Sequence, residues 1–317
     1  MANNKMKKII PALNRDELRQ LLNEETFLRN TNKLDNEIHS FSTNNSLKLL
    51  YEVCRLREIT FRHSGGGTGK ELDVDEYDVH SENPYQQLVV YNSKDQEIVG
   101  AYRYMLGSED FPLNVDGNPS FATSKLFNFS EEFNDVYLSR SIELGRSFIQ
   151  PKYQANMKLG MFSLMNLWDG LGSLVLQNPK HNYFLGKVTF YDNYNKDALD
   201  LILTYFDQCC KPEKELFKPK EEKEYLRPVN EDNIKLFENR SLEEGHKILQ
   251  AEMRKIDQQI PPLVNIYINT SPNLQVFGTA HNKEFGNVLE TGILIPIDKI
   301  YDHKLTLHVN YNQKKNN

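Results

Sequence analysis

The sequence predicts an α/β (α+β) protein with one central mixed, mostly antiparallel sheet and helices on both of its faces. The first observation is a set of strand-like segments in which apolar residues alternate with polar ones or run together. These segments are residues 37–41, 87–92, 97–104, 136–148, 183–191, 261–269 and 288–297. The second observation is a set of helical patterns between them, at residues 46–62, 158–177 and 196–210. Helices interspersed among strands in this order predict one sheet covered by helices.

The N-terminal part of the chain predicts a short helical extension before the sheet. Asn14 is a plausible N-cap, and Glu17 three residues later has the spacing of a capping box. The hairpin predicted from residues 87–92 and 97–104 follows from the turn-forming residues between them. Residues 107–135 are rich in Gly, Pro, Asn and Ser and predict a loop with one short helical piece.

The strand predicted at residues 136–148 carries ionisable groups where apolar residues are expected. They are Arg140, Glu143 and Arg146. A partly buried charge is costly unless it is paired, so this strand is either an ion-paired scaffold or a reaction centre. In a regular strand Glu143 and Arg146 point to opposite faces. For both to reach one site, a bulge is needed, and we expect Gly145 to permit it.

The second half of the chain contains a strongly apolar helix and a charged stretch. Residues 158–177 are apolar almost all round, which is typical of a buried helix. Residues 211–258 are dominated by Lys, Glu and Asn and predict an exposed, partly helical insertion. The chain therefore divides into five segments. They are an N-terminal helical extension (1–36), a core (37–210), this insertion (211–258), the closing strands of the core (259–309) and a frayed tail (310–317).

Composition is that of an ordinary globular protein. Of 317 residues, 39% are hydrophobic and 26% are charged, and the net charge is −6. This balance argues against general nucleic-acid binding, because there is no basic excess to neutralise phosphates. Cys54, Cys209 and Cys210 have neither a metal-site nor a disulfide-framework spacing, which favours a reducing, cytoplasmic compartment. We expect no signal peptide and no membrane-spanning segment.

Two loop segments between residues 64 and 78 invite a ligand-binding interpretation. The glycine cluster Ser64–Lys70 fails the phosphate-loop pattern, because Ser64 replaces the first glycine and Glu71 follows the lysine. It is either a flexible loop or a loop whose backbone amides close over a small anion. The acidic stretch Leu72–Asp78 lacks the spacing of a calcium loop, so we expect no metal site there.

Four short motifs resemble those of the N-acyltransferase superfamily related to the GNAT acetyltransferases. They are R-x-x-x-F at Arg57–Phe61, D-x-x-D at Asp75–Asp78, V-G-x-x-R at Val99–Arg103 and E-[LI]-[SG]-R at Glu143–Arg146. Pro261–Tyr267 and Phe285–Val288 further resemble the branch that acylates ornithine or glycine. That branch is related to the acyl-homoserine-lactone synthases, and some of its members are called hemolysin-like. The resemblance covers roughly residues 37–297.

The resemblance implies a GNAT-like fold with a splayed pair of strands and a defined reaction. A long-chain fatty acyl group, with or without a 3-hydroxyl, would pass from an acyl-carrier-protein thioester to the amine of glycine or ornithine. The GNAT pyrophosphate signature, [QR]-x-x-G-x-[GA], is missing, since Gln154–Gly160 does not fit it. That signature binds CoA phosphates at a helix N-terminus. Its absence favours a carrier protein over acyl-CoA as donor, and we expect no bound cofactor.

The resemblance also implies roles for individual residues. Glu143 is expected to accept the proton of the amine, while Arg103 and Arg146 either fix acidic groups or bind the carboxylate of the amino acid. Arg140 is expected to be scaffold. Acceptor binding is expected at Arg57, Phe61, Gly66, Gly67, Asp75 and Asp78. Donor binding is expected at Phe148, Ile149, Gln150, Lys152, Lys158 and Lys187, with backbone amides near Phe148–Gln150 as oxyanion donors.

Partners and alternatives follow from the same resemblance. An acidic carrier protein needs a local basic face on this acidic chain, for which the candidates are Lys125, Lys152, Lys158 and Lys187. The amphiphilic product makes transient contact with the inner face of a membrane plausible. The alternatives are a lactone synthase, an acetyl-CoA-dependent acetyltransferase and, more remotely, a non-catalytic membrane-active protein. A separate alternative for Glu143, Arg57, Asp75 and Asp78 is an ion-paired cluster with no chemistry.

Overall fold

One large sheet organises the computed structural model, which describes residues 6–221 and 230–309. Its strand order is β1-β2-β3-β4-β6-β7-β10-β9, and every neighbouring pair is antiparallel except β6 and β7. The strands are β1 (Phe27–Asn30), β2 (Glu37–Phe41), β3 (Gln86–Asn92), β4 (Glu97–Leu106), β6 (Ser141–Ile149), β7 (Tyr183–Phe190), β9 (Gln275–Asn282) and β10 (Val288–Pro296). The predicted mixed, mostly antiparallel sheet is confirmed.

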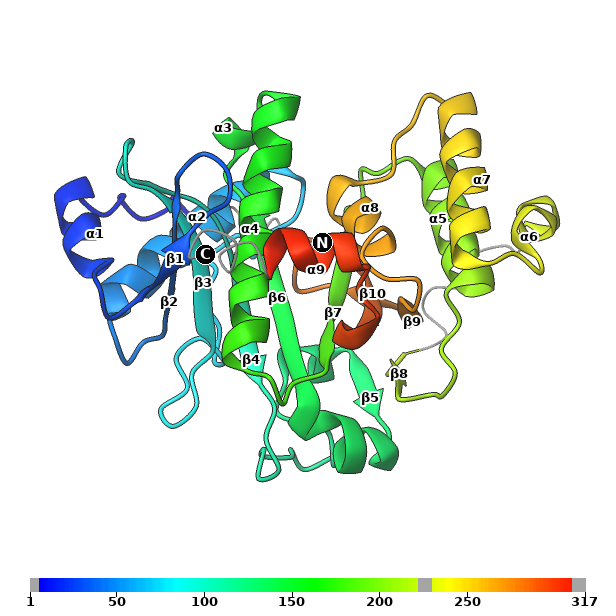
Figure 1. Ribbon diagram of the computed structural model, residues 1–317, viewed down its shortest axis with the longest axis horizontal. Helices are drawn as coiled ribbons and strands as arrows, with labels where there is room; N and C mark the ends of the chain where they lie inside the picture. Colours follow the sequence, from blue (N-terminus) through cyan, green and yellow to red (C-terminus); the bar gives the residue numbers. More distant parts are fainter. Residues whose placement is uncertain (1–5, 222–229, 310–317) are drawn as a thin grey trace.

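Helices cover both faces of this sheet (Figure 1). They are α1 (Arg15–Leu21), α2 (Leu47–His63), α3 (Pro151–Gln154), α4 (Met157–Gln177), α5 (Lys196–Cys209), α6 (Glu231–Phe237), α7 (Leu242–Lys255), α8 (Pro262–Ile268) and α9 (Asp302–His308). Short helical turns are η1 (Ala122–Lys125), η2 (Phe133–Tyr137), η3 (Leu138–Arg140) and η4 (Ile297–Lys299). A separate pair of short strands is formed by β5 (Phe127–Phe129) and β8 (Phe217–Pro219).

The alternation of side chains along β3 explains why the two faces have separate cores. Leu88 and Val90 pack with α4, whereas Val89 and Tyr91 pack with α2. Successive residues of a strand point to opposite faces, so each face buries every second residue. Burial on both faces requires a nearly continuous apolar run, which β3 and β4 both have.

The predicted last pair of strands is only half right. Residues 261–269 form helix α8, not a strand. Two consecutive prolines start this segment, and proline is well suited to the first turn of a helix but cannot donate to a sheet ladder. Val264, Tyr267 and Ile268 then bury one helical face, and the strand next to β10 is β9 instead.

The charged region 211–258 is less exposed than predicted. Helices α6 and α7 pack against α5 (Figure 1), and they extend the main core with Phe237, Leu242, Leu249 and Met253. Their charged residues lie on the outward faces, which is why the composition suggested an exposed insertion. Residues 222–229 of this region, and the predicted frayed tail at 310–317, lie outside the described residues.

Two further boundaries differ from the sequence prediction. The N-terminal extension is a helix of seven residues capped by Asn14, followed by the edge strand β1. The charged strand begins at Ser141, because residues 133–140 form helical turns. Arg140 therefore lies before the strand, where it hydrogen-bonds Asn182.

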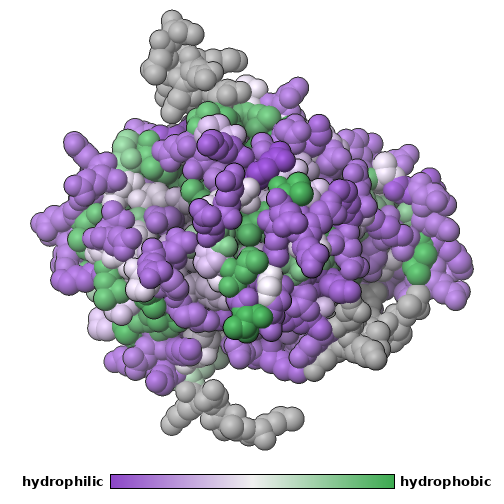
Figure 2. Space-filling view, turned by 90° about the horizontal axis from the view of Figure 1, so that it is seen from below, coloured by the Kyte–Doolittle hydropathy of each residue, from purple (hydrophilic) through white to green (hydrophobic). Residues whose placement is uncertain are grey.

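The surface is mainly hydrophilic on the face seen from below, with small separate hydrophobic patches (Figure 2). Among the described residues, one helix, α4, is long and apolar enough to cross a membrane by length and composition. Because 56% of the apolar stretch of α4 is buried inside the protein, α4 also meets the description of a core helix. Its N-terminal end is more open, and Met157 is 85% exposed.

Candidate active site

The central feature of the site is an opening in the sheet between β6 and β7. Residues Ser141–Leu144 of β6 pair with residues Tyr183–Gly186 of β7, and beyond this point the two strands diverge. A cavity of about 700 Å³ lies at the divergence, within the range of small-molecule sites. Every residue from Glu143 to Ile149 lines it. Because consecutive strand residues face opposite sides, the cavity must reach both faces of the sheet.

A bulge in β6 brings charged side chains to one face. Ala101 and Arg103 of β4 pair with Phe148 and Gly145, so β6 has one more residue than β4 in this interval. Arg146, not Gly145, takes the left-handed backbone conformation, with φ of 50°. The bulge is where the sequence predicted it, but the strained residue is the arginine itself. As a result Arg146 and Arg103 both contact Asp75 on the α2 side of the sheet.

We call the α2 side of the cavity the polar chamber. It is lined by Tyr85, Arg103, Ala122, Glu143, Arg146, Lys187 and Glu290. Glu143 is buried and accepts a hydrogen bond from the hydroxyl of Tyr85. The other carboxylate oxygen of Glu143 accepts a hydrogen bond from the amide of Thr123 at 2.7 Å. The amide of Ala122 donates to the carboxylate of Glu143 and to the hydroxyl of Tyr85. Burial and the charge of Glu143 raise the pKa of Tyr85 well above its usual value, so Tyr85 stays protonated.

Behind this chamber lies a network of three arginines and three aspartates. Arg57 pairs with Asp73 and Asp78, Arg103 with Asp75 and Asp78, and Arg146 with Asp73 and Asp75. Burial alone would raise the pKa of Asp78, but the charges of Arg57 and Arg103 outweigh burial and hold it well below its usual range. The network is balanced in charge, which is the condition for burying so many ions.

Arg146 is the most exposed arginine of this network, and with Arg103 it lines the cavity. Its side chain is 18% exposed, against 1% for Arg57 and 4% for Arg103. It stacks on Phe285, with its guanidinium carbon 4.3 Å from the ring centroid. Arg146 therefore presents a partly exposed guanidinium to the cavity, and a guanidinium is suited to bind an anion.

A second charged pair lies across the chamber, on β7 and β10. Lys187 Nζ is 3.6 Å from Glu290 Oε2, and Glu290 is only 5% exposed. Thr189 is directly opposite Glu290 in the register of the two strands. Lys187 therefore lies inside the cavity and not on a basic outer face, which corrects that part of the carrier-docking prediction.

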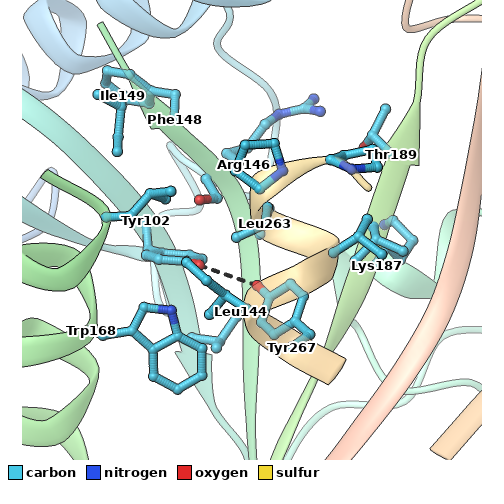
Figure 3. Close-up of a pocket in the computed structure, with 18 of the residues that line it drawn as sticks. Tyr102, Leu144, Arg146, Phe148, Ile149, Trp168, Lys187, Thr189, Leu263 and Tyr267 are labelled. Atoms are coloured by element: carbon cyan, nitrogen blue, oxygen red, sulfur yellow. Dashed lines mark hydrogen bonds between the residues drawn. The ribbon is translucent and has the colours of Figure 1, made fainter. Parts of the chain in front are cut away.

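We call the α4 side of the cavity the apolar chamber. Its walls come from β6, α4 and α8, and they include Leu144, Leu164, Met165, Trp168, Leu263 and Tyr267. Tyr102 and Tyr267 point toward one another across it and share a hydrogen bond of 3.1 Å (Figure 3). In the same view Leu144 and Trp168 lie beside this pair, while Lys187 and Thr189 line the opposite strand. The cavity therefore joins the polar chamber to the apolar chamber through the opening in the sheet.

Comparison with known proteins shows the family of this chain. A family model described as an acetyltransferase (GNAT) domain matches residues 56–163, which include the second half of α2 and β3 to β6. A protein of Phocaeicola vulgatus named glycine N(alpha)-acyltransferase is 44% identical, over 96% of this chain and 93% of that protein. One of the same name from Bacteroides thetaiotaomicron is also 44% identical, over 96% of this chain and 90% of that protein. The chain belongs to this family of GNAT-related N-acyltransferases. No solved structure matches.

Some of the predicted acceptor residues line the cavity of the acyltransferase, and others do not. Phe61 lines the cavity, whereas Arg57, Asp75 and Asp78 do not. The two aspartates form ion pairs with Arg103, and Arg57 pairs with Asp78. Gly66 and Gly67 are not among the lining residues. A Cβ on Gly66 would lie 2.6 Å from the ring of Tyr191, which explains the need for glycine there.

The glycine loop of the acyltransferase already holds an anion of its own. The buried carboxylate of Glu58 accepts from the amides of Thr68 and Gly69, at 3.0 and 2.8 Å, and from the hydroxyl of Thr68. These two amides of the loop therefore bind a side chain of the same chain. Acceptor binding by Gly66 and Gly67 stays a prediction.

The predicted donor residues are likewise divided. Phe148 and Ile149 line the cavity, but the amide of Gln150 donates to Val99 in β4 at 2.9 Å and is not free to stabilise an oxyanion. Lys152 pairs with Glu97 on the surface, and Lys158 is exposed near the start of α4. Lys125 pairs with Glu76 at 2.7 Å, beside Tyr77.

Several residues of the acyltransferase site were missed at the sequence level. They are Tyr85, Trp168, Tyr267 and Glu290. A signal existed for Glu290, because it is the one carboxylate in the apolar strand Val288–Pro296, the same signal that drew attention to Glu143. The aromatic residues gave no such signal, since tyrosine and tryptophan in buried elements usually pack the core. Among the described residues, no cluster of His, Cys, Asp or Glu is suited to hold a metal ion.

Proposed function

We propose that this protein transfers a long-chain fatty acyl group from an acyl-carrier-protein thioester to the amine of glycine. The product is an N-acylglycine and a free carrier thiol. The observation that carries the proposal is the cavity that joins an apolar and a charged chamber through the opened sheet. Glycine is preferred to ornithine as acceptor because both relatives are named for glycine.

The polar chamber fits an amino acid that carries opposite charges. The partly exposed guanidinium of Arg146 suits the carboxylate of glycine, in a contact of the kind that arginine makes with carboxylates. The amine would then lie among Glu143, Tyr85, Lys187 and Glu290, which line the same chamber. Since the amine is protonated at neutral pH, one of the carboxylates has to accept a proton before the attack.

The apolar chamber fits the acyl chain. Its walls are aliphatic and aromatic side chains of α4, α8 and β6, and an aliphatic chain gains about 0.8 kcal/mol for each methylene that it buries. Acyl chains with and without a 3-hydroxyl are both candidates, and Trp168 has an indole N–H without a hydrogen-bond partner among the described residues. The thioester carbonyl would lie between the chambers, beside the bulge at Arg146 and Ser147.

The start of α4 supports a carrier protein over CoA as donor. In this chain the side chain of Asn156 accepts from the amides of Lys158 and Leu159, at 2.9 and 3.2 Å. These first-turn amides are the groups that would otherwise bind a pyrophosphate. A phosphopantetheine arm presents a single phosphate and depends less on them.

The test is product formation with defined substrates. The purified protein is incubated with a long-chain acyl-carrier protein and glycine, and the products are identified by mass. We expect N-acylglycine, with slower turnover for ornithine and for the corresponding acyl-CoA. Equal or faster turnover with acyl-CoA would overturn the carrier assignment, and amide formation only with ornithine would overturn the acceptor.

A further inference from the structure

Two carboxylates line the polar chamber, and their hydrogen bonding differs. Both oxygens of Glu143 accept bonds from fixed donors of the protein, namely Tyr85 and the amides of Ala122 and Thr123. Glu290 Oε2 has no hydrogen-bond donor among the described residues. Its nearest cation, Lys187 Nζ, is 3.6 Å away, longer than a direct charge-assisted hydrogen bond. Glu290 Oε1 accepts a hydrogen bond from the hydroxyl of Thr189 at 3.4 Å. Glu290 Oε2 is therefore the carboxylate oxygen of this chamber whose lone pairs accept no hydrogen bond from the described residues.

The position of Glu290 places that lone pair beside the other groups of the chamber. Glu290 is opposite Thr189 in the antiparallel register of β10 and β7, and directly opposite residues share one face of a sheet. Lys187, two residues earlier on β7, is on that same face and its Nζ lies 3.5 Å from the carbonyl oxygen of Ala122. Ala122 in turn bonds Tyr85, which bonds Glu143. The two carboxylates thus border one chamber from opposite strands.

We propose that Glu290 accepts the proton from the ammonium group of the acceptor amino acid, with Lys187 as its counter-ion. Glu143 then acts as a positioning residue that fixes Tyr85 and η1. This inference rests on the proposed function, since it assigns a role in that reaction. It explains why a carboxylate is buried in β10 with one oxygen left without a donor, an arrangement that is costly for stability alone.

The proposed step balances in atoms and charge. The ammonium group gives one proton to Glu290, and the freed lone pair of nitrogen forms a bond to the thioester carbonyl carbon. The carbonyl electron pair moves to oxygen and returns as the C–S bond breaks. The nitrogen loses its second proton to the departing sulfur, which leaves as the thiol. Glu290 releases its proton to solvent, so each amide bond formed releases one thiol and one proton.

The test compares glycine with an acceptor that needs no deprotonation. Hydroxylamine is neutral at pH 7.5, so its acylation does not require the proposed proton acceptor. We expect Glu290→Gln to lower the rate with saturating glycine by about 100-fold or more, the usual contribution of a general base, and to lower the rate with hydroxylamine by less than about fivefold. With glycine, the variant should recover as pH rises toward the pKa of the glycine ammonium.

Controls separate a catalytic from a structural role. Glu284→Gln, at an exposed position in the same hairpin, should behave as wild type with both acceptors. Glu143→Gln should slow both acceptors alike. If Glu290→Gln does not fold, Glu290→Asp decides, because a shorter carboxylate should slow glycine more than hydroxylamine. Equal losses with both acceptors in the Glu290 variant, or a rate within threefold of wild type, would overturn the inference. Product formation by the wild-type protein tests the proposed function separately.

Discussion

The buried arginine–aspartate network gives a sharp stability prediction for Asp78→Asn. Asp78 Oδ2 lies 2.6 Å from Arg57 and 3.2 Å from Arg103, and neither Asp78 nor Arg57 is more than 1% exposed at its side chain. An asparagine of the same shape keeps one acceptor but presents an amide N–H₂ toward a guanidinium. The loss of one partner leaves a buried cation uncompensated, which costs about 3–5 kcal/mol.

The assay is urea unfolding at pH 7, with Asp192→Asn as the matched control. Asp192 pairs with Lys196 at 3.1 Å, but both side chains are more than two-thirds exposed, so the control should change the free energy of unfolding by less than about 1 kcal/mol. A loss in Asp78→Asn no larger than in the control would refute the assignment of this network as a buried, mutually dependent cluster.

The pH dependence has a definite sign. The folded-state pKa of Asp78 is lowered, so the unfolded chain binds its proton more readily than the folded chain. The stabilisation is therefore complete above the unfolded pKa of about 3.9 and is lost as pH falls toward the lower folded value. The gap between wild type and Asp78→Asn should stay constant from pH 7 to about pH 5 and narrow below about pH 4. A gap that widens on acidification would contradict this.

Three other predictions concern catalysis and substrate binding. Arg146→Ala should raise the KM for glycine more than tenfold and change the apparent affinity for the acyl donor little, whereas Arg146→Lys should recover part of the loss; a selective effect on the donor would contradict the carboxylate role. Shortening the acyl chain by two carbons should lower kcat/KM by up to about 15-fold, because two methylenes are worth about 1.6 kcal/mol, and a flat dependence on chain length would argue against the apolar chamber as the acyl site. The double charge reversal of Lys152 and Lys158 should slow the reaction with acyl-carrier protein at low salt but not at high salt, with exposed Lys255→Glu as control; an unchanged rate would remove these lysines from the docking face.

The sequence was most informative where chemistry and strand periodicity conflict. Glu143 and Arg146 in an otherwise apolar strand predicted either an ion-paired scaffold or a reaction centre, with a bulge if both reach one site. The structure places both residues on the cavity beside that bulge. The conflict was detectable because a two-residue period assigns each side chain to a face. The roles of these residues in catalysis stay predictions.

What the sequence could not supply is the set of neighbours brought together over long separations. Residues 261–269 contain Val, Ile and Tyr typical of strands, and this pattern outweighed the two prolines that favour a helix start; the helical spacing of the buried residues is seen only in the fold. Lys187 was expected on a basic surface, but its partner Glu290 lies on a strand that pairs with β7 from far along the chain. Glu58, likewise, occupies the glycine loop that was expected to receive a ligand.

The central claim is that one cavity joins an acyl thioester to the amine of glycine. The most direct measurement is a single-turnover reaction of long-chain acyl-carrier protein with ¹⁵N-glycine, followed by mass analysis of the lipid product and by thiol titration. We expect one ¹⁵N atom in the amide of each product molecule and one carrier thiol released with it. Release of thiol with only free fatty acid, and no label in the lipid product, would contradict the claim.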